Sequence, residues 1–494
     1  MVFPAEFDSN SPVPDLVLGY VSVRSQGGVS VTEATDFTSA EPFYAASGDW
    51  ERARSDVEAA GLIVTAESRL GFSVAGPPAA YEELTSGEIV TREVLQRLAI
   101  GRTAYVTQLD IVGTDQPRSF AVGRAGSDAI EAIVLERPRI HHNLFPSPIP
   151  PSIAKFHLTL PDDVAVLLGC VAAHRAGHVG SDVTVAMVDT GQYSHPYFLV
   201  HNYRVERPVA VVPGTSPSKD PVGHGTGESA NIFAVAPGAT LRPYRVTNKA
   251  GQLVGAITGF LRAKAGHPQI ITNSWGGDLD YPTQDPLPPY YRAWVAEIRD
   301  AIETGIVVVF SAGNGQFSVE PQVPGVISAG GVYATAGVDL VASDYASGYA
   351  SPFFPGIDVP TVSGLVGTIP RAQYLLLPIP PGCGIDVDES KPFVHPTFPD
   401  SPDGTTADDG WALFSGTSAA APQLAGAVAV LLGALPALTT AQITEALKAS
   451  AVDVTAGHNH PRYNVAAGPG PDLATGAGLV NVSAALDYAQ ATFS

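Results

Sequence analysis

The sequence is poor in cysteine and in basic residues. Only 2 of its 494 residues are cysteine, Cys170 and Cys383, which excludes a disulfide framework and a cysteine-based metal site. Lysine and arginine number 27 against 48 aspartate and glutamate residues, so the formal net charge is −21. Such an excess of negative charge argues against nucleic acids and anionic membranes as partners, and it is compatible with bound cations.

The sequence also lacks a segment with the character of a signal peptide or a membrane span. Its N-terminus has neither a basic start nor an apolar core. The longest apolar stretch, residues 419–438, contains Pro422 and Gln423, which favours a buried helix over a membrane-spanning one. As written, the sequence predicts a cytoplasmic protein, although a chain trimmed of its signal peptide would have the same character.

What the sequence does contain is typical of a well-packed globular protein of two domains. Hydrophobic residues make up 45% and charged residues 15% of the chain. A length of 494 residues favours more than one domain. Residues 146–151 are rich in proline and predict a stiff, extended connector. We therefore predict an N-terminal domain over residues 1–150 and a second domain over residues 151–494.

The N-terminal part has the pattern of a small α+β domain. Apolar residues from Trp50 to Ala60 follow helical spacing, and Gly61 is placed to end that helix. A second helix is predicted to begin at Pro77 and Pro78 and to run through Leu84. Strands are predicted at residues 62–64, 70–74, 103–111 and 129–135. Because no residue here has a catalytic pattern, this domain is predicted to be structural or regulatory.

The second domain contains apolar runs that are typical of buried parallel strands. The runs at residues 183–188 and 307–310 are almost continuous, as expected for strands covered on both faces. The first ends at Asp189, and the carboxyl ends of such strands are where open α/β sheets place their functional residues. Glycines flank His224 at a predicted helix start. The pattern predicts an α/β domain with polar residues gathered at one edge of its sheet.

A nonapeptide near the C-terminus defines the predicted chemistry. Residues 414–422 read Phe-Ser-Gly-Thr-Ser-Ala-Ala-Ala-Pro and place Ser418 before a long apolar helix, whose N-terminus favours developing negative charge. This segment resembles the nucleophile signature of subtilisin-like serine proteases, the subtilases. Asp189-Thr190-Gly191 and the segment around His224 resemble the other two motifs of that family, in the same chain order. One departure is Gly227, where subtilases usually carry a second histidine.

The resemblance implies a doubly wound, mostly parallel sheet and a catalytic mechanism. Ser418 is then the nucleophile, His224 the general base, and Asp189 the residue that orients His224. Asn314 matches the asparagine of the family that binds the oxyanion, with the backbone N–H of Ser418 as its partner. The residues matching the segments that bind the substrate backbone and form the pocket walls are Ser274, Trp275, Gly276, Ala312 and Gly313. For Trp275 a second interpretation, packing in the core, is equally open.

Two further segments resemble sedolisins, a branch related to the subtilases. Residues 72–81 resemble part of a sedolisin prodomain, which implies that the N-terminal domain is an intramolecular inhibitor and that the protein is made as a zymogen. The loop formed by Asp453, Val454, Gly468, Gly470 and Asp472 resembles the sedolisin calcium loop, which implies a structural Ca²⁺ ion. A glycine-rich turn with a capping aspartate is the alternative for that loop.

Two acidic segments carry weaker predictions. Glu228 lies four residues after His224, a spacing that also resembles sedolisins, and we predict a helix residue at or near the site. Residues 383–409 are rich in aspartate and proline and predict a solvated loop. The alternative there is a second cation site formed by Asp386 and Asp388.

The sequence as a whole predicts a serine endopeptidase that acts on polypeptides and needs no cofactor for its chemistry. One alternative is a catalytically silent relative that serves as a binding or scaffold protein. Another is a protease that its own N-terminal domain keeps latent until a processing protein releases it.

Overall fold

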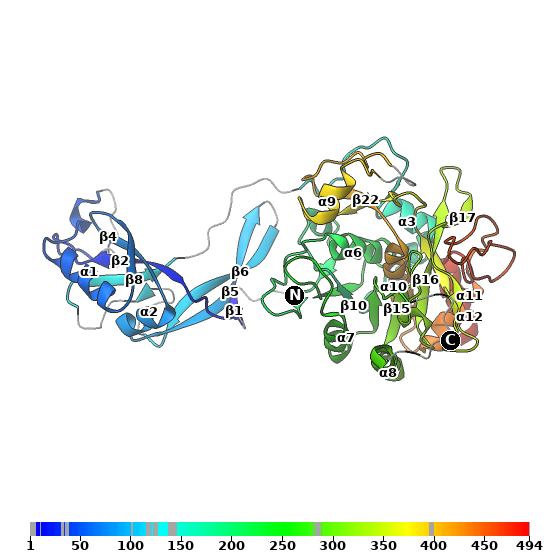
Figure 1. Cartoon of the computed structure of the whole chain (residues 1–494), viewed down its shortest axis with the longest axis horizontal. Helices are drawn as coiled ribbons and strands as arrows, with labels where there is room; N and C mark the ends of the chain where they lie inside the picture. The colour runs from blue at the N-terminus through cyan, green and yellow to red at the C-terminus, as the bar shows by residue number, and fades with distance from the viewer. Residues whose placement is uncertain are drawn as a thin grey trace. The chain divides into compact units, whose positions relative to one another are not determined.

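The chain forms two compact units, Met1–Leu144 and Phe145–Ser494. The computed structural model describes residues 6–9, 11–30, 34, 39–99, 102–114, 120–121, 127–136, 146–279, 281, 287, 289–394 and 400–493. In Figure 1 the first unit runs from blue to cyan and the second continues from cyan to red. Each unit is described by itself.

The N-terminal unit combines two antiparallel sheets with two helices. Helices α1 and α2 contribute Val57 and Tyr81 to a core shared with strand residues such as Val21 and Phe72. The larger sheet has the order β3-β4-β2-β8-β7 and the smaller one β1-β5-β6. The elements are β1 (Glu6–Asp8), β2 (Val17–Val23), α1 (Asp49–Ala59), β3 (Ile63–Glu67), β4 (Gly71–Gly76), α2 (Pro78–Thr85), β5 (Glu88–Ala99), β6 (Arg102–Val112), β7 (Phe120–Ala121) and β8 (Ile130–Leu135). The predicted α+β character and both predicted helices are confirmed.

The second unit is built on a sheet of nine strands, which are mostly parallel. Its order is β11-β13-β10-β14-β15-β16-β17, with β12 also paired to β13 and β20 to β16. Its strands are β10 (Thr184–Asp189), β11 (Arg204–Val205), β12 (Val209–Ala210), β13 (Thr240–Arg245), β14 (Ile270–Asn273), β15 (Val307–Ser311), β16 (Ile327–Ala334), β17 (Leu340–Ala342) and β20 (Val362–Leu365). Because chain order reverses on either side of β10, a crevice is expected at the carboxyl ends of β10 and β14.

Side chains of the central strands alternate between two cores, as a sheet covered on both faces requires. Val185 and Met187 of β10 belong to the core that α6 (His224–Val235) and α10 (Thr417–Ala434) cover. Ala186 and Val188 face the opposite core, which α7 (Ala256–Ala265) and α8 (Pro289–Glu303) cover. The domain is therefore the doubly wound α/β fold that the sequence predicts.

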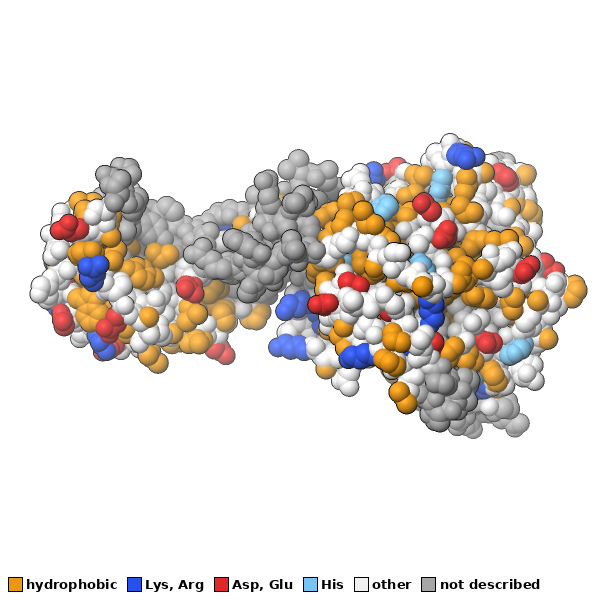
Figure 2. All heavy atoms as spheres, turned by 90° about the horizontal axis from the view of Figure 1, so that it is seen from above, with side chains coloured by type: hydrophobic (Ala, Val, Ile, Leu, Met, Phe, Trp, Pro, Cys, Tyr) orange, Lys and Arg blue, Asp and Glu red, His pale blue; other side chains and the backbone are white. Residues whose placement is uncertain are grey.

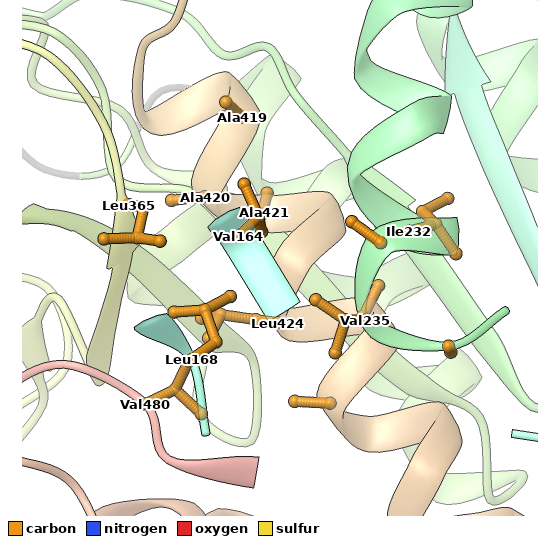
Figure 3. Close-up of a cluster of buried hydrophobic side chains, with 14 of the residues drawn as sticks. Val164, Leu168, Ile232, Val235, Leu365, Ala419, Ala420, Ala421, Leu424 and Val480 are labelled. Carbon is orange, nitrogen blue, oxygen red and sulfur yellow. The ribbon is translucent and has the colours of Figure 1, made fainter. Parts of the chain in front are cut away.

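Helix α10 is the centre of the larger core. Figure 3 shows Ala421 and Leu424 of α10 beside Ile232 and Val235 of α6. Among the described residues, α10 is the one helix with the length and composition of a membrane span, but 83% of that window is buried inside the protein. The prediction of a buried core helix is confirmed.

The remaining elements complete the second unit. A small sheet of order β22-β21-β9 lies apart from the main one. These elements are β9 (Leu158–Thr159), α3 (Asp162–Leu167), α4 (Val171–Arg175), α5 (Pro196–Val200), β18 (Tyr349–Ala350), β19 (Asp358–Val359), β21 (Leu375–Pro378), α9 (Gly384–Glu389), β22 (Trp411–Phe414), α11 (Thr440–Ala449) and α12 (Val482–Phe493), with a short 3₁₀ helix η2 (Glu320–Gln322). A further 3₁₀ helix, η1 (Glu41–Phe43), belongs to the N-terminal unit. Figure 2 shows charged side chains of both signs dispersed among hydrophobic ones on its visible face.

Two segments of this unit depend on contacts with residues distant in the sequence. Residues 162–175 form two short helices, α3 and α4, which are separated at Gly169, where φ is +66° next to the side chain of Asn481. Residues 383–409, predicted as a solvated loop, are exposed at many of their described positions, but they contain α9 and bury Asp386 and Asp403 completely. Their carboxylates accept backbone N–H groups, which is why these two acidic residues can be buried.

Candidate active site

Asp189 and His224 meet at the carboxyl edge of the sheet. Asp189 is the last residue of β10 and is buried, and His224 is the first residue of α6. His224 Nδ1 lies 2.8 Å from Asp189 Oδ1, which also accepts the backbone N–H of Thr190 at 2.7 Å. Asp189 Oδ2 has no hydrogen-bond partner among the described residues. This arrangement leaves Nε2 of His224 as the nitrogen available for proton transfer.

Glycines hold His224 at this position because larger residues do not fit. Gly223 adopts φ +95°, and a Cβ there would lie 2.4 Å from Cys383 Sγ. A Cβ on Gly225 would lie 2.4 Å from the carbonyl oxygen of Gly191. The two glycines therefore allow the close approach of the helix start to the loop after β10.

Asp220 is a positioning residue that the sequence interpretation missed. Its buried carboxylate accepts hydrogen bonds from the hydroxyl of Thr190 at 2.8 Å and the backbone N–H of Gly223 at 2.9 Å. It also accepts both the N–H, at 2.9 Å, and the hydroxyl, at 2.7 Å, of Thr226. Asp220 thus ties the loop after Asp189 to the first turn of the histidine helix. A carboxylate just before a helix start is the sequence signal for such a role.

Ser418 is the second residue of α10 and faces the end of β14 in this structure. Its hydroxyl donates to the carbonyl oxygen of Ser274 at 3.1 Å, and the Ser274 hydroxyl donates to the carbonyl oxygen of Ser418 at 2.8 Å. Among the described hydrogen bonds, none joins Ser418 to His224. The serine is placed at a helix N-terminus as predicted, with its hydroxyl turned toward Ser274.

Asn314 lies in the loop after β15 and contacts the start of α10. Its Oδ1 accepts both the backbone N–H and the hydroxyl of Thr417 at 2.9 Å. This assignment leaves the amide nitrogen directed to the Gly416 side, where a Cβ on Gly416 would lie 3.0 Å from Nδ2. An amide donor beside Gly416, two residues before Ser418, suits an oxyanion.

The predicted substrate segments follow two neighbouring strands. Residues 274–276 follow β14 and residues 312–313 follow β15, and these strands pair in parallel with Asn273 opposite Phe310. Further on, the two loops are joined by the N–H of Leu279 donating to the carbonyl oxygen of Phe317 at 3.0 Å. Gly313 adopts φ +111° and donates its N–H to Thr417 Oγ1 at 3.1 Å. The structure therefore brings Ser274, Gly276, Ala312 and Gly313 to the same edge as Ser418.

Trp275 has the contacts of a core residue. Its indole N–H donates to the carbonyl oxygen of Val188 at 2.7 Å. Its ring centroid lies 5.4 Å from both Trp294 and Phe310. Of the two interpretations left open for Trp275, these contacts favour packing in the core.

Gly227 departs from the family pattern because Phe414 occupies the space beside it. A Cβ on Gly227 would lie 2.4 Å from Cζ of Phe414. The Phe414 ring also lies near the His224 ring, with centroids 6.4 Å apart. The aromatic side chain of Phe414 in β22 thus fills the space that a side chain at position 227 would need.

Glu228 is buried directly beside His224. Its Oε1 lies 3.8 Å from His224 Nε2, and its side chain has no exposed surface. Burial opposes charge on His224, but the Asp189 and Glu228 carboxylates outweigh it and raise the pKa of the imidazole to about 9. Burial raises the pKa of Glu228 to about 8, against the opposing effect of His224. The prediction of a helix residue at the site is confirmed.

The predicted calcium residues form a hydrogen-bonded turn. The backbone N–H groups of Gly468 and Gly470 donate to the carboxylates of Asp472 and Asp453 at 2.8 and 3.0 Å. The other oxygen of Asp472 accepts from residues 474 and 475, and Val454 is buried. Since donors point at the carboxylates, this conformation does not fit a cation that needs six to eight oxygen ligands. Calcium binding here stays a prediction, and it would require the loop to change its conformation.

The acidic residues of α9 do not form a cluster suited to a metal ion either. Among the described residues, no group of three or more His, Cys, Asp and Glu side chains is placed to hold a metal ion. This includes Asp386 and Asp388 of α9. Both cysteines are free and buried.

Comparisons with known proteins agree with this geometry. The model of the subtilase family matches residues 180–478, which is more than half of the chain. Subtilisin NAT of Bacillus subtilis subsp. natto is 27% identical over 327 residues, covering 64% of this chain and 68% of its own length. Subtilisin Savinase of Lederbergia lenta is 27% identical over 324 residues, covering 64% of this chain and 94% of its own.

A solved structure of a related enzyme aligns with nearly the whole chain. Fervidolysin from Fervidobacterium pennivorans, described as a keratinolytic enzyme related to subtilisin, is 19% identical with a TM-score of 0.47. The alignment covers 97% of this chain and 62% of the fervidolysin chain. On the strength of the family match, the chain belongs to the subtilase family and is a subtilisin-like serine endopeptidase.

Proposed function

We propose that peptide bonds are cleaved by a triad of Ser418, His224 and Asp189. The observation that carries the proposal is the 2.8 Å contact between Asp189 Oδ1 and His224 Nδ1 at the carboxyl edge of the sheet, beside the helix that bears Ser418. In this mechanism Ser418 Oγ attacks the carbonyl carbon and passes its proton to His224 Nε2. Asp189 fixes the tautomer and stabilises the imidazolium.

The first step requires the Ser418 side chain to turn. Its hydroxyl donates to Ser274 at rest, so the attack begins when that bond is exchanged for one to His224 Nε2. The negative charge on the substrate oxygen would then be met by Asn314 Nδ2 and the N–H of Ser418, a first-turn N–H that its helix leaves unpaired. Substrate backbone would lie along residues 274–276 and 312–313.

We further propose that the N-terminal unit is an intramolecular inhibitor and that the protein is made as a zymogen. Its own core and its α+β elements support an independently folded segment that precedes the peptidase unit. The Pro-rich residues 146–151 belong to the larger unit, where Trp411 Nε1 donates to the carbonyl oxygen of Ser147 at 3.0 Å. Cleavage is expected on the N-terminal side of this anchored segment.

The test is the intact mass of the full-length protein over several hours, beside Ser418→Ala. Loss of the mass of residues 1–144 in the wild type alone is expected. If both proteins stay intact, self-cleavage is refuted, and labelling with a fluorophosphonate then separates the alternatives. Labelled Ser418 indicates a protease whose N-terminal unit is retained or removed by another enzyme, and Ser418 that stays unlabelled even after residues 1–150 are deleted indicates a silent relative.

A further inference from the structure

Two carboxylates face opposite nitrogens of the His224 ring. Asp189 contacts Nδ1 at 2.8 Å, and Glu228 Oε1 lies 3.8 Å from Nε2. Glu228 follows His224 by four residues on α6, so both side chains lie on the same face of the helix. The triad uses the first carboxylate and leaves the second without a role.

Only one carboxylate oxygen of Glu228 accepts a hydrogen bond from a neighbouring side chain. Oε2 accepts a hydrogen bond from Asn231 Nδ2 at 3.0 Å. Asn231 Oδ1 in turn accepts from Gln423 of α10 at 3.0 Å, and Gln423 bonds to both backbone groups of Leu365. This chain of side chains fixes the plane of the carboxylate by linking α6 to α10 and β20.

The other oxygen, Oε1, has no hydrogen-bond partner among the described residues. Leaving a fully buried carboxylate oxygen unpaired costs free energy, so its position needs an explanation beyond packing. The atom within reach is Nε2 of His224, the nitrogen that takes the proton in the proposed mechanism.

The groups that act on this pair come from several elements. Besides burial, His224 lowers the pKa of Glu228 and Asp189 of β10 raises it. Asp220, in the loop before α6, also raises the pKa of His224. Tyr345 is the neutral titratable neighbour, with its hydroxyl paired to Ser415 Oγ at 3.2 Å. The buried ring of Phe414 lies near the His224 ring, with centroids 6.4 Å apart.

We propose that Glu228 is a positioning residue that holds the Nε2 side of His224 and stabilises the proton that this nitrogen receives from Ser418. The inference rests on the proposed triad and names a fourth group in it. When Ser418 Oγ forms its bond to the substrate carbon, the carbonyl electron pair moves to oxygen and the serine proton moves to Nε2. The resulting imidazolium would then lie between two carboxylates.

This role predicts how activity depends on pH. The reaction needs neutral His224, so activity should rise as pH increases through the pKa of the ring. Glu228 is one of the groups that raise this pKa, which reaches about 9. Replacing Glu228 with a neutral residue should therefore move the rise in activity to lower pH, by about one unit.

The stability of the protein should also depend on pH through His224 and Glu228. Both His224 and Glu228 have folded-state pKa values above their ordinary values of 6.5 and 4.5. The native state then binds protons more tightly, so their contribution is present at low pH and is lost as pH rises toward 8 and 9. Glu228→Gln should flatten this decline in the inactive Ser418→Ala protein.

The experiment compares Glu228→Gln, Glu228→Asp and a matched control, Glu320→Gln. Gln keeps the size of Glu228 and its acceptor for Asn231 while removing the charge, and Asp keeps the charge at greater distance. Glu320 is a second buried glutamate with an unpaired oxygen, placed in η2. The readout is the rate of fluorophosphonate labelling of full-length protein against pH, with kcat and KM on a peptide.

We expect Glu228→Gln to lower the pH midpoint by about one unit, to reduce the maximal rate about tenfold, as loss of one positioned group does, and to leave KM nearly unchanged. Glu228→Asp should have an intermediate midpoint, and Glu320→Gln the wild-type one. A folded Glu228→Gln protein with the wild-type midpoint would overturn the proposal. If that variant does not fold, an unmoved midpoint in Glu228→Asp would do the same.

A second measurement separates this inference from the proposed function. NMR titration of the His224 ring in the Ser418→Ala protein reports the ring pKa without any catalysis. If the wild type is never labelled but Glu228→Gln still lowers the ring pKa, the triad proposal fails while the coupling of Glu228 to His224 holds. An unchanged ring pKa refutes the coupling itself.

Discussion

Buried carboxylates of the peptidase unit fall into two groups that differ in how many hydrogen bonds they accept. Asp220 and Asp403 are buried and use both oxygens to hold backbone and hydroxyl donors. Asp189 and Glu228 are equally buried, yet each has one oxygen without a hydrogen-bond partner among the described residues. Asp220 and Asp403 hold loops in place, whereas Asp189 and Glu228 lie against the His224 ring and act on its charge.

The largest effect should come from a partly bonded carboxylate. Asp189→Asn removes the charge that faces His224 Nδ1 and allows the wrong tautomer, so kcat should fall about 10⁴-fold, as in the equivalent change of an unrelated triad protease. Peptide hydrolysis against active-site concentration measures it. An unchanged melting temperature would assign the loss to chemistry, whereas activity near that of the wild type would remove Asp189 from the mechanism.

Replacing a fully bonded carboxylate should mainly lower the free energy of unfolding. Asp220 accepts five hydrogen bonds, and Asp220→Asn replaces one acceptor oxygen with a donor, so we expect a loss of about 3 kcal/mol in the free energy of unfolding. Urea denaturation of the Ser418→Ala protein measures this value.

Asp403→Asn is the matched control for Asp220→Asn. It removes a buried carboxylate that holds Thr405 and Leu413 in another loop. Both variants should lose stability, but only Asp220→Asn should also slow labelling of Ser418 in the folded protein, because Asp220 holds the start of the histidine helix. Equal labelling rates for the two variants would contradict this role.

The smallest effect is expected at the predicted calcium loop. Asp472 accepts from the N–H groups of Gly468, Ala474 and Thr475, so Asp472→Asn should cost about 1–2 kcal/mol. Chelation with EGTA should leave the melting temperature of the wild type unchanged, because the loop donors already satisfy the carboxylates. A fall on chelation that is absent in Asp472→Asn would show instead that the loop rearranges around an ion.

The sequence predicted the elements whose signals are local. Strands β10 and β15 follow from continuous apolar runs and lie within one residue of their predicted bounds. The long helix α10 was also predicted from its apolar stretch, although it begins two residues before residue 419 and ends four residues before residue 438. The break between α3 and α4 could not be predicted, because Gly169 meets Asn481 from the far end of the chain. Within residues 383–409, the burial of Asp386 and Asp403 could not be predicted, because it depends on backbone donors that composition does not reveal.

In the candidate site, too, the residues that could be predicted are those with a local sequence signal. Each triad residue lies in a short motif, and the structure places Asp189 and His224 in contact. The partners that tune them do not share a motif, since Asn231 and Gln423 are separated by 192 positions. Which oxygen of Glu228 stays unpaired, and whether Ser418 rests on Ser274, depends on three-dimensional packing alone.

The contact between Gly227 and Phe414 constrains how this sequence can change. A residue larger than glycine at position 227 would collide with an aromatic ring that comes from β22. A histidine at position 227 would therefore become tolerable only after position 414 has become smaller. A library that varies position 227 alone would therefore miss the combinations that need a smaller residue at position 414.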